Sequence, residues 1–224
     1  MKVKSHIKDL LEKSDFGSRL IADPKLGIET KAVLSLIVNL AFALYNGVLG
    51  LASHSVWFGS VCIYYIILAT MRFGAVISSR KNSPQKERVA LALTGILLML
   101  LSIALSGINY LSQSMDISKS LGTITMITVA AYTFFKLTMA IIRSVRRRGK
   151  DTPLFFAIHC IGYAEAAVSL LNMQRSMLAT FEGMSAKEIV IFNGALGMAV
   201  FLFTLGLGIY MVIKAVKENE NVEN

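Results

Sequence analysis

The chain has 224 residues, of which 54% are hydrophobic and 17% are charged, and its mean hydropathy is +0.60. This apolar share lies above that of an ordinary soluble domain, so a membrane protein is the first expectation. The formal net charge of +9 is spread over several loops and tails with no nucleic-acid-binding module beside it, which argues against nucleic acid as a partner.

Residues 1–31 form a basic arm that we expect to lie in the cytoplasm. Ile7, Leu10 and Leu11 recur there at helical spacing, unlike the continuous apolar run of a signal peptide. Lysines surround this apolar face, as in helices that lie on the inner membrane surface and face anionic head groups. The arm is therefore either an interfacial amphipathic helix or a solvated tail.

Six apolar blocks follow the arm and fill residues 32–213. They cover residues 32–52, 56–79, 88–111, 121–142, 153–174 and 189–213. A block of roughly 20 residues is what an α-helix needs to cross a hydrocarbon core of roughly 30 Å. The breaks are rich in Ser, Gly, Pro and charged residues, and the alternating pattern of a barrel strand is absent. We predict an all-α polytopic membrane protein with a six-helix transmembrane bundle.

The basic residues predict how this bundle is oriented. They concentrate in the arm and in the second and fourth connections, whereas the first, third and fifth connections hold only Lys119, Arg175 and Lys187. Lys and Arg near helix ends are retained on the cytoplasmic side. Both termini, including the tail 214–224, should then be cytoplasmic, and the plasma (inner) membrane is the expected location. Arg146, Arg147 and Arg148 of the fourth connection are expected to contact anionic lipid head groups.

An internal repeat is suggested when the six spans are taken as three hairpins. The stretch YYIILATMRFGAVISSRK aligns with YTFFKLTMAIIRSVRRRG, which matches Met71 with Met139, and the sixth span adds Met211. Such a repeat would be parallel and would give a pseudo-threefold bundle. Some transporters hold their sites between parallel repeats, although hydrophobic sequences also align by chance.

Four ionisable residues fall inside the spans at similar depth. Counted from the expected cytoplasmic ends at about 1.5 Å per residue, Arg72 and His159 lie about 10 Å deep, and Lys136 and Glu165 about 15 and 18 Å deep. A charge at such depth costs several kcal/mol and normally finds a partner in the bundle interior. We expect Lys136 to pair with Glu165, and Arg72 to pair with His159 or Glu165.

Each of these residues also has a purely structural interpretation. The Lys136 and Glu165 pair could simply brace two helices. Arg72 could extend its guanidinium to the inner head groups, and His159 could be a neutral interior histidine. Asn39 and Asn46 of the first span either extend the same polar pathway or form interhelical hydrogen bonds.

Other features narrow the classes of function. Trp57 and Tyr110 lie near the outer ends of spans and fit an interfacial aromatic belt. Cys62 and Cys160 both fall inside spans, which favours packing over a disulfide or a metal site. No phosphate-binding loop, zinc-protease motif or nucleophile elbow occurs, so no cofactor or metal is expected and an enzyme is disfavoured.

The leading functional hypothesis is a small transporter or channel subunit. Its solute or ion pathway would pass a set of polar residues in the cytoplasmic half of the bundle: Asn39, Asn46, Arg72, Lys136, His159 and Glu165. The alternative is a non-transporting accessory or sensory subunit that binds a partner membrane protein or forms a homo-oligomer. The third is an intramembrane or lipid-modifying enzyme with Glu165 and His159 as an acid–base pair, which their spacing of six residues disfavours.

Overall fold

A computed structural model describes residues 24–80, 84–115, 122–145, 153–180 and 183–223 of the chain. The helices of this part are α3 (Pro24–Ser53), α4 (Val56–Arg80), α5 (Pro84–Met115), α6 (Thr123–Val145), α7 (Pro153–Thr180) and α8 (Ala186–Glu223). Within the described residues, six helices are long and apolar enough to cross a membrane, which fits an integral membrane protein. The all-helical prediction is confirmed. Residues 1–23 of the basic arm, together with Arg146, Arg147 and Arg148, lie outside the described residues.

Local sequence explains where several helices begin. Pro24, Pro84 and Pro153 each occupy the first position of a helix, where a missing N–H costs nothing. At the start of α8, the Ser185 backbone N–H donates to Glu188 Oε2 at 2.8 Å, and Ser185 Oγ accepts from the Glu188 backbone N–H at 3.3 Å. This reciprocal arrangement is a capping box, and it satisfies donors that a helix start otherwise leaves unpaired.

The helices extend beyond the predicted apolar blocks. The first begins at residue 24 and not at 32, the fifth ends at 180 and not at 174, and the sixth continues through most of the predicted tail to 223. Hydropathy marks the stretch that matches the hydrocarbon core, whereas backbone hydrogen bonding continues through polar residues beyond it.

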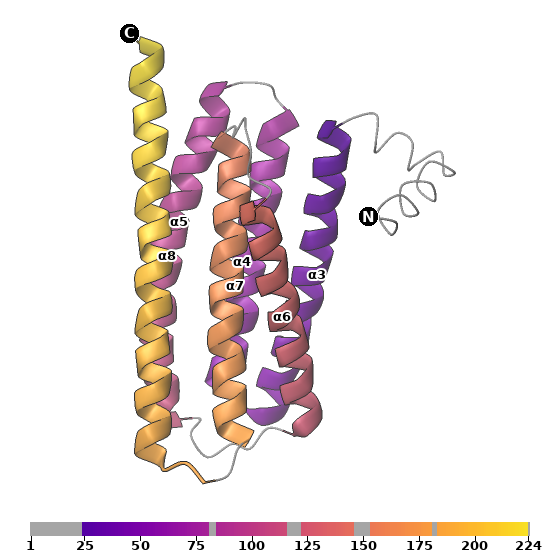
Figure 1. Cartoon of the computed structure of the whole chain (residues 1–224), viewed down its shortest axis with the longest axis vertical. Helices are drawn as coiled ribbons and strands as arrows, with labels where there is room; N and C mark the ends of the chain where they lie inside the picture. Colours follow the sequence, from indigo (N-terminus) through magenta and orange to yellow (C-terminus); the bar gives the residue numbers. More distant parts are fainter. Residues whose placement is uncertain (1–23, 81–83, 116–121, 146–152, 181–182, 224) are drawn as a thin grey trace, which may run out of the picture.

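The helices run alternately up and down, so that α3, α5 and α7 begin at the end of the bundle where α4, α6 and α8 finish (Figure 1). Helix α7 is central to the packing, because 67% of its most apolar window is buried, against 22–50% for the other described helices. It packs against α4, α5, α6 and α8. Polar side chains on α7 therefore meet other helices and not lipid.

The helix packing differs from three equivalent hairpins. In the described residues α3 packs on α4 and α7 packs on α8, but the consecutive helices α5 and α6 do not pack together. Helix α5 lies along α8 instead. Gly95 and Gly208 explain this choice, since a Cβ on either one would lie 2.8 Å from the carbonyl oxygen of the other. Such close backbone approach is typical of small residues between membrane helices.

Apolar side chains cover the outside of the bundle. Leu51 is 80% exposed and Leu44 is 69% exposed on α3, and similar Leu, Ile and Val residues follow the outer faces of α4, α5, α6 and α8. In water so much exposed apolar surface would drive association, whereas in lipid it is the expected surface. Tyr110 is 78% exposed near the end of α5, so its ring is available to an interface.

Candidate functional site

Two basic side chains converge on one carboxylate inside the bundle. Lys136 Nζ of α6 lies 2.9 Å from Glu165 Oε2 of α7, and Arg72 Nη2 of α4 lies 3.0 Å from Glu165 Oε1. All three side chains are almost completely buried. The pairing expected from their similar depth is therefore present, and Arg72 reaches inward to the same carboxylate instead of to the head groups.

An amide from a fourth helix completes this group. Asn39 Nδ2 of α3 donates to Glu165 Oε1, and Asn39 Oδ1 accepts hydrogen bonds from Lys136 Nζ and, at 3.3 Å, from the Tyr132 hydroxyl. We call Asn39, Arg72, Lys136 and Glu165 the charged cluster. It ties α3, α4, α6 and α7 together with hydrogen bonds to charged groups, which are stronger than neutral ones.

The charged cluster lies in one half of the bundle. Arg72 is eight residues before the end of α4, Lys136 nine before the end of α6, and Glu165 twelve after the start of α7. At about 1.5 Å per residue these positions lie about 12, 14 and 18 Å from the same end. His159 also lies on α7 and is partly buried, but its six-residue offset turns it about 240° around the helix from Glu165.

An aromatic layer lies next to the charged cluster, towards the opposite end of the bundle. It is made of Phe42, Tyr65 and Tyr132. Phe42 stacks on Tyr132 at a centroid distance of 3.4 Å, and Tyr65 meets both rings edge-on at 5.2 and 6.0 Å. Lys136 Nζ is 5.3 Å from the centre of the Tyr132 ring, within range of a cation–π interaction. The layer closes one side of the cluster with packed rings.

Beyond the aromatic layer, a chain of amides links three helices. Trp57 Nε1 donates to Asn172 Oδ1 at 2.8 Å, Asn172 Nδ2 donates to Asn46 Oδ1 at 3.3 Å, and Asn46 Nδ2 donates to the Phe42 carbonyl at 2.8 Å. Asn46 thus accepts one interhelical hydrogen bond, from Asn172, and donates another within α3. The assignment of Trp57 to an interfacial belt is wrong: it is 2% exposed, and its N–H has an interior acceptor in Asn172.

Sequence reasoning missed Arg175. The apolar pattern predicts it in the connection after the fifth span, but α7 continues to Thr180, and Arg175 is only 9% exposed. Its Nη1 donates to Asn109 Oδ1 at 2.9 Å, and its guanidinium carbon lies 4.3 Å from the centre of the Trp57 ring. One signal could have found it: polar residues recur at helical spacing after Glu165, at Ser169, Asn172 and Ser176, and all of these are buried.

The charged cluster offers ionic chemistry, because two cations contact one carboxylate. No group of three or more His, Cys, Asp or Glu side chains that could hold a metal ion occurs within the part of the chain that the structure describes. Guanidinium and ammonium groups held near a carboxylate and an amide can bind an anion or exchange a proton. Comparison with known family models, with curated proteins and with solved structures finds no match.

Proposed function

We propose that this protein is a small membrane transport protein for an anionic solute, with the charged cluster as its binding site. The observation behind this proposal is an imbalance of charge between the buried basic and acidic side chains. Glu165 is the one acidic residue in the stretches 56–79, 121–142 and 153–174, and it contacts two basic residues, Arg72 and Lys136. A cationic side chain inside the membrane carries a high free-energy cost, and such residues commonly mark solute pathways.

A solute anion would compete with Glu165 for the two cations. Arg72 offers a planar donor set suited to carboxylate or phosphate oxygens, and Lys136 adds a compact ammonium. Binding would satisfy both basic groups and free the Glu165 carboxylate to move or to take up a proton. In the charged cluster, the Glu165 carboxylate is thus the anion that a solute could replace. Asn39 holds Glu165 and Lys136 in place through its hydrogen bonds.

The aromatic layer would act as the barrier in this proposal. It separates the charged cluster from the amides at Asn46 and Asn172, so that the site is closed towards that end. By the distribution of Lys and Arg, that end faces outward, and both termini lie in the cytoplasm of a plasma-membrane protein. Transport would require Phe42 and Tyr132 to separate.

Flux measurements in reconstituted vesicles test the proposal. Lys136→Met is the informative variant, because it leaves Arg72 and Glu165 as a charge-balanced pair and so keeps the bundle folded. Lys217→Met, an exposed lysine of α8, is the matched control. With chloride, phosphate and succinate as probes, we expect flux of at least one anion, a loss of at least tenfold in Lys136→Met, and no change in the control. Equal flux in the native protein and Lys136→Met would overturn the proposal.

The short contact between Lys136 and Glu165 supports a second candidate function. A contact of 2.9 Å between two buried groups also suits a brace that fixes helix packing in an accessory subunit. The burial of Arg72 and Lys136 keeps both away from the lipid-facing surface, so a partner protein would have to contact another face. Cross-linking in native membranes distinguishes the two: a specific complex without anion flux favours the accessory role, and a strict monomer argues against it.

A further inference from the structure

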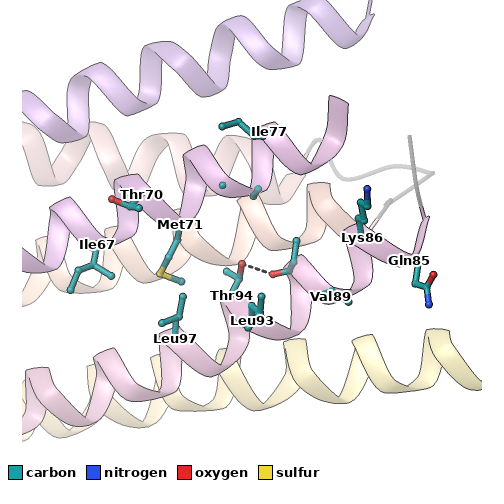
Figure 2. A pocket seen from close by; sticks show the side chains of 13 residues that line it. Ile67, Thr70, Met71, Ile77, Gln85, Lys86, Val89, Leu93, Thr94 and Leu97 are labelled. Carbon is teal, nitrogen blue, oxygen red and sulfur yellow. Dashed lines mark hydrogen bonds between the residues drawn. The ribbon is translucent and has the colours of Figure 1, made fainter. Parts of the chain in front are cut away.

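A cavity separate from the charged cluster lies between α4 and α5. Its volume is about 880 Å³, and Figure 2 shows side chains of the two helices facing each other across it. Met71 and Gly74 contribute from α4, and Val89, Leu93 and Leu97 contribute from α5. We call this cavity the α4–α5 groove.

The walls of the α4–α5 groove are effectively apolar. Its two threonines direct their hydroxyl protons to their own helices: Thr70 Oγ1 donates to the Ile66 carbonyl at 2.9 Å, and Thr94 Oγ1 donates to the Ala90 carbonyl at 2.7 Å. This leaves methyl and methylene groups to face the groove. Such a surface suits a hydrocarbon chain and gives a polar solute little to bind.

The ends of the groove differ in polarity. Lys86 and Gln85 line it where α5 begins, close to the end of α4, and Lys86 is exposed (Figure 2). From Lys86 to Leu97 the helix rises about 16 Å, which is close to half of a hydrocarbon core of roughly 30 Å. The groove therefore has about the length of one membrane leaflet, with a cation at its polar end.

We propose that the α4–α5 groove binds an anionic phospholipid, with an acyl chain along the apolar wall and the head-group phosphate at Lys86. Small residues line the recess on both sides, Gly74 and Ala75 on α4 and Ala90 on α5, and they leave room that larger side chains would fill. A lysine at this level attracts anionic lipids by electrostatics, and the recess adds contact area that a flat helix face lacks. This inference does not depend on the transport proposal.

Two variants separate the acyl-chain site from the head-group site. Gly74→Leu places a larger apolar side chain in the groove, and a Cβ at this position meets nothing within 4 Å. Lys86→Gln removes the cation alone. The matched controls are Gly107→Leu, where a Cβ also meets nothing within 4 Å, and Lys217→Gln, an exposed lysine of α8.

Native mass spectrometry of the full chain, titrated with phosphatidylglycerol or with phosphatidylcholine of the same acyl chains, measures the binding. We expect the native protein to bind phosphatidylglycerol about fivefold more tightly than phosphatidylcholine. One basic residue near the membrane surface attracts an anionic lipid by about this factor. Lys86→Gln should abolish this preference, and Gly74→Leu should weaken binding of both lipids at least fivefold. Both controls should behave like the native protein.

Several results would overturn the inference. One is equal binding of the two lipids by the native protein, and another is unchanged lipid binding in Gly74→Leu. A loss in Gly107→Leu as large as that in Gly74→Leu would show that the effect is not specific to the groove. Displacement of phosphatidylglycerol by millimolar inorganic phosphate would make Lys86 a simple anion site with no contribution from the acyl chain.

Discussion

Removing the Glu165 carboxylate is the most severe single change that the charged cluster allows. Glu165→Gln keeps the size of the side chain and its contact with Asn39, but it leaves Arg72 and Lys136 buried without the anion that both contact. An uncompensated charge in the interior costs far more than a missing neutral hydrogen bond. We therefore expect this variant to be folded poorly or to melt early.

The contact distances give the scale of the effect. At 2.9 and 3.0 Å and an effective dielectric constant of about 20, each ion contact has a Coulomb energy of about 6 kcal/mol. Desolvation cancels part of this, and breaking a buried pair costs about 3–5 kcal/mol in measured cases. Because two cations lose one carboxylate, we expect about 5 kcal/mol, or a fall in melting temperature of about 10–20 °C for a chain of this size.

Thermal unfolding in a mild detergent, with and without a second substitution, checks this reasoning. Lys136→Met by itself should cost less than about 2 kcal/mol, since Arg72 and Glu165 remain paired. The double variant Glu165→Gln/Lys136→Met should be more stable than Glu165→Gln, because it removes one of the two buried cations that have lost the carboxylate. Glu188→Gln, at an exposed capping position that Gln also fills, is the control. A double variant less stable than Glu165→Gln would refute the charge argument.

Three further predictions concern packing away from the charged cluster. Gly208→Ala should destabilise the α5–α8 contact by about 1–3 kcal/mol. The control Gly206→Ala should be neutral or stabilising, because a Cβ there meets nothing within 4 Å. Similar melting temperatures for the two variants would contradict the close approach of Gly208 to Gly95. Asn172→Ala leaves the buried indole N–H of Trp57 without its acceptor and should cost about 1–3 kcal/mol, measurable through the emission of this single tryptophan. Arg175→Lys keeps the charge but loses the planar stack on the indole ring, so a loss of about 1 kcal/mol is expected, and an unchanged melting temperature would count against the stacking.

The sequence by itself determined the number and rough limits of the membrane helices. Each apolar block must be long enough to cross the hydrocarbon core, and this requirement leaves a strong signal in every span. It also determined that Lys136 and Glu165 share a depth, because rise per residue converts position along a helix into distance from the membrane surface. Their contact at 2.9 Å requires that shared depth, and it offsets the high cost of a charge in lipid.

Only the tertiary structure decided which helices are neighbours. Hydropathy does not encode that Gly95 approaches Gly208, and it is this approach that sets α5 against α8 and not against the next helix in the chain. Hydropathy also fails for Arg175 and Trp57. A charge normally ends a predicted span, and an aromatic residue near its end normally marks the interface. Here the two stack on each other inside the bundle and donate to Asn109 and Asn172. Such partners come from helices distant in sequence, so their meeting depends on packing and not on local pattern.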